Sequence, residues 1–241
     1  MDKLKKDFSV RIYECDRDGS LHFGKIFNLF QEVADENANQ IGVGYDYCLA
    51  HNIGWVGAGY VVKIDRMPAC EEKFTLYTWP SDKTAVSAIR DFKAVSEKGD
   101  TLFYATSQWA LVNLETKRLV RMEENLPPYE PIRERVIDST FPAIPLPERV
   151  DHSLTYPVRF DEIDINKHVN NAVYPLWASE AVPSDFRSSH TVKGLSVAFK
   201  RPAVFGTTIA AETQIDETTT RTAIKSADDG TVFARVQIDW A

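Results

Sequence analysis

Residues 159–171 read Arg159-Phe160-Asp161-Glu162-Ile163-Asp164-Ile165-Asn166-Lys167-His168-Val169-Asn170-Asn171 and lead directly into an apolar helical pattern. The stretch places a carboxylate, an amide and an imidazole at alternate positions, on Asp164, Asn166 and His168. In an extended segment a period of two turns these side chains to one side, and in a loop they still approach the start of the helix. A water-activating site needs such groups. We therefore expect the three residues to converge on one small ligand.

The helix that follows is predicted to add a second carboxylate. At about 100° per residue, four of its residues fall within a narrow arc: Val173, Leu176, Trp177 and Glu180. Glu180 is therefore expected on the buried face of the helix. A carboxylate seldom lies on such a face without a partner or a function.

A purely structural interpretation accounts for the same residues. In it Glu180 is a hydrogen-bonded core residue. The other polar residues then only cap turns and the helix start: Asp164, Asn166, Asn170 and Asn171. The gathering of so many polar groups around one helix start favours a functional site.

The order of these residues resembles the signature of the acyl-acyl-carrier-protein thioesterases, the plant plastid enzymes and their bacterial relatives. The matching residues in the second half are Asp164, Asn166, His168, Val169, Asn170, Asn171, Tyr174, Trp177, Glu180 and Pro183. In the first half the resemblance continues through Tyr13-Glu14, Gln31-Glu32, Trp55-Val56, Arg66 with Pro68, Thr78-Trp79-Pro80 and Arg90-Asp91-Phe92. It covers nearly the whole chain in the family's order.

The resemblance implies an α+β fold, a tandem (double) hotdog in which each half is a curved antiparallel sheet wrapped around a long helix. The sequence itself indicates a duplication, because residues 8–12 correspond to residues 156–160. The two halves also end alike, since Gly99 leads to Trp109 at the same spacing as Gly230 leads to Trp240.

A connector is predicted between the two copies. Six of the twelve prolines fall between Pro127 and Pro147, and such a stretch cannot sustain a helix or an inner strand. We expect an N-terminal hotdog repeat over residues 1–126, a Pro-rich linker over 127–150 and a C-terminal repeat over 151–241. Only the second repeat carries the full polar set, so one active site per chain is expected.

The resemblance implies hydrolysis of a fatty acyl thioester. His168 is the best candidate to take a proton from water, because an imidazole titrates near neutral pH and Asp164 could orient it. Asn166 would hold the water or the thioester. Backbone N–H groups near Asn170 and Asn171 would stabilise the oxyanion. Glu180 could share the role of base, and the sequence leaves the choice between it and His168 open.

One stretch departs from the plant pattern. Where the plant enzymes have Tyr-x-x-Glu-Cys, this chain has Phe199-Lys200-Arg201-Pro202-Ala203, without the acid or the thiol. A covalent mechanism therefore lacks its nucleophile at the family position, and direct attack by water is the simpler interpretation. The three cysteines, Cys15, Cys48 and Cys70, are expected to be reduced thiols, and no residue spacing predicts a metal or cofactor.

Charge and hydropathy limit the partners. The net charge of −7 argues against nucleic-acid binding. No apolar run approaches the roughly 20 residues of a membrane span, and the first residues do not resemble a signal peptide, so a cytoplasmic protein is expected. The resemblance implies acyl carrier protein, an acidic partner, and hence a local basic patch, for which the candidates are Lys193, Lys200 and Arg201. It also implies a homodimer.

Two alternatives remain open on the sequence. The first is a coenzyme A thioesterase, because the chemistry is the same and only the carrier differs. The second is a catalytically silent acyl-binding hotdog protein, for which Pro202 and Ala203 would be signs of lost activity. Retention of the polar set around His168 argues against the second alternative.

Overall fold

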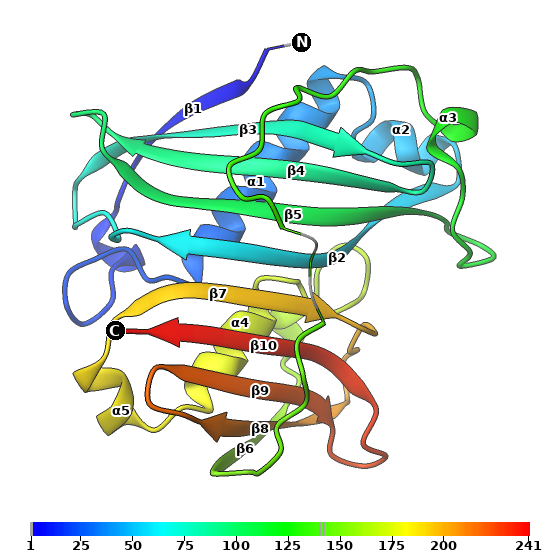
Figure 1. The fold of residues 1–241 in the computed structure, drawn as a ribbon. Helices are drawn as coiled ribbons and strands as arrows, with labels where there is room; N and C mark the ends of the chain where they lie inside the picture. Colours follow the sequence, from blue (N-terminus) through cyan, green and yellow to red (C-terminus); the bar gives the residue numbers. More distant parts are fainter. Residues whose placement is uncertain (1, 140, 142) are drawn as a thin grey trace. The chain divides into compact units, whose positions relative to one another are not determined.

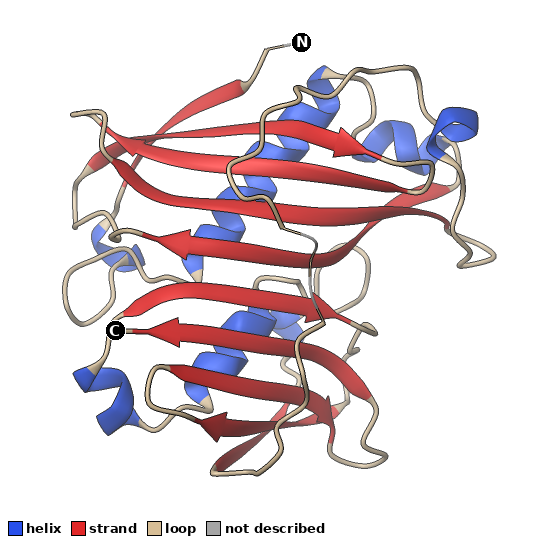
Figure 2. Cartoon of the chain, viewed as in Figure 1, coloured by secondary structure: helices blue, strands red, loops and turns tan. Residues whose placement is uncertain are grey.

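The computed structural model describes residues 2–139, 141 and 143–241. The chain divides into two compact units (Figure 1). The first comprises Met1–Ala58 and Val62–Phe141, and the second comprises Gly59–Val61 and Pro142–Ala241. Strands account for most of the regular structure of each unit, as Figure 2 shows.

The first unit packs its sheet against one long helix. Its strands are β1 (Leu4–Ser9), β2 (Ile53–Ile64), β3 (Lys73–Lys83), β4 (Ser87–Ser96) and β5 (Thr101–Asn113). Its helices are α1 (Lys25–Gln40), α2 (Tyr45–Ala50) and α3 (Met122–Asn125). The strand order is β1-β3-β4-β5-β2, and the pairs β1/β3, β3/β4 and β4/β5 are antiparallel.

Helix α1 lies across the sheet because its apolar residues recur at helical spacing. The buried positions include Ile26, Phe30 and Val33, which repeat at intervals of three and four residues and so share one face. Phe30 is fully buried, and its ring lies 4.4 Å from that of Phe92 and 6.0 Å from that of Phe103, on β4 and β5. This aromatic cluster joins the helix to the sheet.

The second unit repeats the arrangement. Its strands are β6 (His152–Pro157), β7 (Val192–Phe199), β8 (Thr208–Ile215), β9 (Thr219–Ser226) and β10 (Val232–Trp240). They follow the order β7-β10-β9-β8-β6 with antiparallel neighbours. Its helices are α4 (Val173–Glu180) and α5 (Ser184–Ser189). Each unit is thus a hotdog fold, so the predicted α+β tandem hotdog is confirmed.

The helix of the second unit is shorter than expected. Helix α4 has only eight residues, whereas α1 has sixteen. Pro183 follows three positions after Glu180, and the residue before a proline is disfavoured in the helical conformation. The helix therefore ends at Glu180, and the six residues from Ser184 to Ser189 form a separate helix, α5.

The described part of residues 127–150 carries no helix or strand. It is nevertheless held at both ends. The Trp79 indole donates to the Glu134 carbonyl at 2.8 Å in the first unit, and Arg149 donates to the Asp216 carboxylate at 2.9 Å in the second. The stretch is therefore an extended segment that docks on each unit in turn.

The loop that precedes each long helix is built twice by the same bonds. Residues 11–26 align without a gap with residues 159–174, a separation of 148 positions. Each loop opens with a 3₁₀ turn, η1 (Ile12–Glu14) or η2 (Phe160–Glu162). Each turn ends in a glutamate that accepts from a main-chain N–H three positions earlier: Arg11 N–H to Glu14 at 3.0 Å and Arg159 N–H to Glu162 at 2.8 Å.

Candidate active site

The predicted polar residues lie in one tight loop before α4. A single β-bridge joins Ile163 to Val169 and closes the loop. Inside it the Asp164 N–H donates to the His168 carbonyl at 2.8 Å, and the Asp164 carboxylate accepts from the Asn166 N–H at 2.8 Å. Asp164, Asn166 and His168 are therefore brought together, as the sequence predicts.

The loop leaves two of these side chains available. Asn166 is exposed and His168 is half-buried. Among the described residues, no side chain or backbone group hydrogen-bonds the amide of Asn166 or the imidazole of His168. The expectation that Asp164 orients the imidazole is not met here, because Asp164 meets His168 only through the main chain and uses one carboxylate oxygen to cap Asn166. Asp164 therefore has a structural role at least.

Between these residues the backbone is strained. Lys167 has a φ of 63°, in the left-handed region that side chains with a Cβ rarely adopt. The corresponding residue of the first unit is Gly19, with a φ of 79°. A glycine would relieve the strain at no steric cost. Strained non-glycine residues cluster at functional sites, so Lys167 strengthens the case for this loop.

The start of α4 is held by Asn170. Its side-chain oxygen accepts from the Ala172 N–H at 2.9 Å, and its own N–H donates to the Glu162 carbonyl at 2.9 Å. The Asn170 N–H is therefore not free to bind an oxyanion. The neighbouring Asn171 N–H has no acceptor among the residues that the structure describes. Of the two asparagines expected to supply donors, only Asn171 offers a free main-chain N–H.

Glu162 is a functional candidate that sequence reasoning missed. It is 7% exposed, and its carboxylate accepts from the Arg159 side chain at 2.9 Å and from the Trp177 indole N–H at 3.3 Å. These bonds fasten the turn before the loop to α4. A signal was present in the sequence, because an arginine precedes a glutamate by three positions in both loops.

The prediction that Glu180 lies on the buried face of α4 is wrong. Its side chain is 56% exposed and pairs with Arg187 at 2.9 Å. The buried face is centred one position later along the helix, on Tyr174, Trp177 and Ala178, all at most 5% exposed. Trp177 belongs to both the predicted and the observed buried face, so its position does not distinguish the two. The buried carboxylate expected on α4 is instead supplied by η2.

Glu180 belongs to a different group of polar side chains. Burial, with a smaller contribution from the Glu180 charge, raises the pKa of Tyr156 to about 12. Arg187 acts on the same phenol in the opposite direction. Glu180 is the last residue of α4, so the rise of the helix separates it from the loop by about 10 Å.

Ala203 stands at the position where the resemblance implies a cysteine in the plant pattern. It is fully buried, and its N–H donates to the Tyr174 hydroxyl at 3.0 Å. Its carbonyl accepts from the Val169 N–H at 2.9 Å. The segment after β7 is therefore fixed directly against the loop, and it brings no thiol to it. The cysteines Cys15 and Cys48 belong to the first unit.

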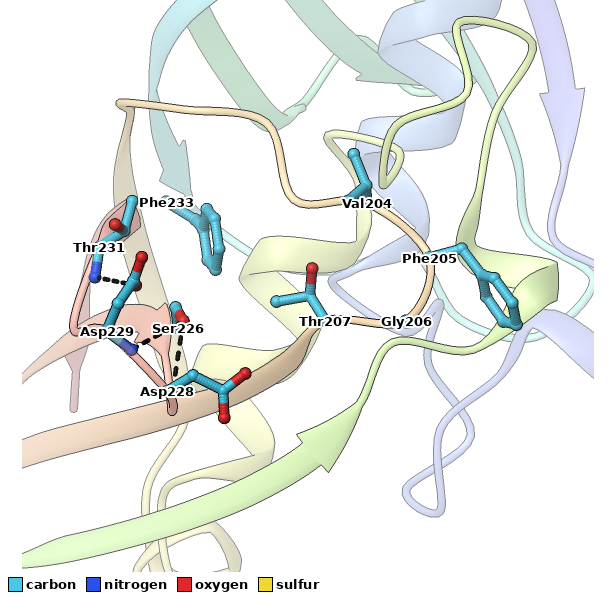
Figure 3. Close-up of a pocket in the computed structure, with 9 residues that line it drawn as sticks. All are labelled: Val204, Phe205, Gly206, Thr207, Ser226, Asp228, Asp229, Thr231 and Phe233. Carbon is cyan, nitrogen blue, oxygen red and sulfur yellow. Dashed lines mark hydrogen bonds between the residues drawn. The ribbon is translucent and has the colours of Figure 1, made fainter.

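A hollow of about 450 Å³ opens next to this segment (Figure 3). Its apolar wall includes Val204, Phe205 and Phe233, and its polar rim includes Asp228 and Asp229. Figure 3 shows the two aspartates on the turn between β9 and β10, opposite the segment that carries Phe205. The rim is acidic, so an anionic partner is disfavoured on this side.

The three basic candidates do not lie together. Lys200 and Arg201 are exposed and directly follow β7, next to the segment fixed against the loop. Lys193 is exposed at the opposite end of β7. Seven residues of strand separate Lys193 from Lys200, which is roughly 23 Å at the rise of an extended chain.

The double hotdog with a polar loop before its second helix defines the class of this protein. Two family models match nearly the whole chain. The Acyl-ACP thioesterase N-terminal domain matches residues 1–128, and the Acyl-ACP thioesterase C-terminal domain matches residues 147–241. The chain belongs to the acyl-ACP thioesterase family, so the resemblance read from the sequence is confirmed.

Individual relatives are similar in sequence along most of the chain. The chain is 24% identical over 233 residues to the chloroplastic acyl-[acyl-carrier-protein] hydrolase FATB3 of Cuphea viscosissima, with 88% of this chain and 55% of that protein covered. It is 26% identical over 270 residues to the chloroplastic palmitoyl-acyl carrier protein thioesterase of Gossypium hirsutum, with 98% and 63% covered. The chain thus spans less than two thirds of the length of these relatives.

A solved structure shows the same fold along the whole chain. The structure of an acyl-ACP thioesterase from Bacteroides thetaiotaomicron superposes with a TM-score of 0.88 at 22% identity, and the match covers 99% of this chain and 98% of that one. Within the described residues, no helix is both long and apolar enough to cross a membrane.

Proposed function

We propose that this chain hydrolyses the fatty acyl thioester of acyl carrier protein and releases the free fatty acid. The observation that carries the proposal is the loop before α4, which holds Asn166 and His168 on a strained backbone and leaves both side chains without partners among the described residues. Membership of the acyl-ACP thioesterase family and the names of the relatives support the same substrate.

The proposed reaction is direct attack by water. His168 accepts a proton as the water oxygen bonds to the thioester carbonyl carbon. Asn166 donates to the water or to the carbonyl oxygen, and the Asn171 N–H, at the positive end of α4, donates to the developing oxyanion. The tetrahedral intermediate then breaks its carbon–sulfur bond, and the protonated His168 returns a proton to the carrier thiolate. Asp164 fixes the turn that carries these groups.

His168, and not Glu180, is the proposed base. Glu180 is the last residue of α4, and its carboxylate forms an ion pair with Arg187. Its charge is therefore neutralised, and it is distant from Asn166. The imidazole of His168 is two positions from Asn166 in a closed loop. Proximity of base, water and donor is what accelerates hydrolysis.

The carrier is proposed to dock on the side of Lys200 and Arg201. Two largely exposed aromatic residues adjoin this region, Phe160 at 74% and Phe205 at 61%, with their rings 5.7 Å apart. An exposed aromatic pair beside basic side chains suits a partner with an acidic, partly apolar surface. Phe205 also lines the neighbouring hollow, so the docking face is proposed to end at Phe205 and to exclude the acidic rim formed by Asp228 and Asp229.

The test is turnover of purified protein on a panel of acyl chains carried by acyl carrier protein and by coenzyme A. Replacing His168 or Asn166 with alanine should reduce kcat by at least ~100-fold, the scale of a lost base or aimed donor. The matched controls are Ser20→Ala and Asp18→Ala, at the corresponding positions of the first loop. They should leave kcat within about twofold.

The outcomes separate the alternatives. Faster hydrolysis of coenzyme A esters would identify a coenzyme A thioesterase, and tight acyl binding without turnover would identify a silent binding protein. A His168→Ala variant that retains activity within a few-fold would exclude the proposed base.

The water mechanism requires no cysteine. Replacing Cys15, Cys48 and Cys70 together should leave kcat nearly unchanged, apart from packing losses of about 1–3 kcal/mol in stability. Burial raises the pKa of Cys48 to about 11, so this thiol is a poor nucleophile at neutral pH. An acyl adduct on any cysteine, detected by mass spectrometry, would instead support a covalent route.

A homodimer and a cytoplasmic location, both expected from the sequence, remain proposals. Light scattering coupled to size exclusion tests the first, and fractionation of the source cells tests the second.

A further inference from the structure

The Tyr174 hydroxyl lies at the junction between α4, the loop and the segment after β7. The residue is on the first turn of α4 and is 2% exposed. Its oxygen accepts from the Ala203 N–H, and the Ala203 carbonyl accepts from the N–H of Val169, the neighbour of His168. One buried residue, Ala203, therefore links the tyrosine on the helix to the backbone that carries the proposed base.

The first unit builds the same junction without a hydroxyl. There the Leu21 N–H donates to the Pro68 carbonyl at 2.9 Å, so Pro68 occupies the place of Ala203. Proline has no N–H to donate. The residue 148 positions before Tyr174 is Ile26, which has no hydroxyl and is 1% exposed. Donor and acceptor are missing together, so the fold of the junction does not require the bond.

The burial and the hydrogen bonding of the Tyr174 hydroxyl suggest a role beyond packing. Burial raises the pKa of Tyr174, the Asp164 charge raises it further, and the Ala203 N–H acts in the opposite direction. The hydroxyl accepts one bond, and its proton has no acceptor among the described residues. A buried phenol with a spare donor, bonded to the segment that holds the loop, is more than a packing residue.

We infer that Tyr174 is a positioning residue, whose hydroxyl acts through the backbone of Ala203 to hold the His168 backbone at a fixed distance from the start of α4. The inference rests on the proposed hydrolysis at His168 and adds a residue to it. The donor Asn171 lies at that helix start, so a loose junction would separate the base from the oxyanion donor. Misplacement by about 1 Å can cost 10²-fold in rate.

The experiment compares Tyr174→Phe with the double variant Tyr174→Phe/Ala203→Pro. The single variant removes the hydroxyl and leaves the Ala203 N–H buried without an acceptor, so its thermal midpoint should fall by several degrees. The double variant removes donor and acceptor together, as Pro68 and Ile26 do, and should recover most of the midpoint. Both variants should show kcat lowered about 10- to 100-fold with KM within about threefold.

A purely structural hydroxyl predicts a different result. Its double variant would regain kcat together with the thermal midpoint, and that result would overturn the inference. So would a Tyr174→Phe variant with kcat within twofold of the wild type. If Ala203→Pro prevents folding, the single variant still decides, because a positioning role changes kcat and leaves KM nearly unaffected.

An activity-independent readout separates this inference from the proposed function. The ring proton of His168, assigned by its loss in His168→Gln, should change chemical shift in the Tyr174→Phe variant and in the double variant. If wild-type protein hydrolyses neither thioester, the proposed function fails, and the spectrum still tests the link between Tyr174 and His168. An unchanged His168 signal in both variants would refute that link.

Discussion

Replacing Glu162 with alanine should destabilise the second unit by about 3–6 kcal/mol. The carboxylate accepts from the Arg159 N–H at 2.8 Å and from the Trp177 indole at 3.3 Å, and each hydrogen bond to a charged acceptor contributes about 1.5–3 kcal/mol. The ion pair with the Arg159 side chain adds little, about 0–1 kcal/mol, because that side chain is 77% exposed. Trp177 is 5% exposed, so its N–H would be left buried without a partner.

The chain contains its own control for this measurement. Glu14 holds the corresponding position of the first loop and accepts from the Arg11 N–H at 3.0 Å, but the residue in place of the tryptophan is Leu29. Because the Arg11 N–H bond to Glu14 is exposed to solvent, whereas Glu162 is buried, Glu14→Ala should cost only about 0.5–1 kcal/mol. Chemical denaturation of both variants, followed by circular dichroism, measures the difference. Losses within 1 kcal/mol of each other would refute the argument that the indole bond makes Glu162 special.

Two further substitutions separate charge from structure. Asp164→Asn keeps an oxygen that can cap the turn but removes the charge. Because Asp164 meets His168 only through the main chain, we expect the thermal midpoint to be unchanged and kcat to stay within about twofold, as for Asp16→Asn in the first loop, and a 10-fold loss of kcat in Asp164→Asn alone would show that the charge itself acts on His168. Charge reversal at Lys200 and Arg201 should weaken turnover of the acyl carrier protein substrate, most at low salt, and spare the coenzyme A ester. Lys193→Glu, at the far end of β7, is the matched control, and an equal loss there would place the carrier elsewhere.

The fold could be predicted because its information is local and repeated. Residues 8–12 and 156–160 share one pattern, and the proline-rich stretch between the copies excludes regular structure there. The length of α4 was not predictable from periodicity, because its apolar residues continue through Ala181 and Val182 to Pro183. Only the position of that proline signals that the helix ends early.

The prediction that Glu180 is buried was wrong because the apolar pattern of α4 does not identify its buried face. Helix α4 is apolar on several sides, so no arc of polar residues marks its exposed face. Val173 and Leu176 are large and apolar but only half-buried, whereas Ala178 and Ala181 are small and fully buried. The large apolar side chains therefore predicted the wrong buried face. Which face is buried was decided by packing against β8, β9 and β10, which no local pattern records.

Duplication explains why the loop itself was predicted well and its bonds were not. Asp16 and Asp164 accept the same main-chain N–H, from the residue two positions on, at 3.0 and 2.8 Å. The aspartate therefore holds the turn in both loops, including the first loop, which has no imidazole. A resemblance to a catalytic signature does not reveal this structural role. The first loop folds with an aspartate and a serine in the places of Asn166 and His168. The fold therefore does not require the amide or the imidazole, which supports the proposed catalytic role of both.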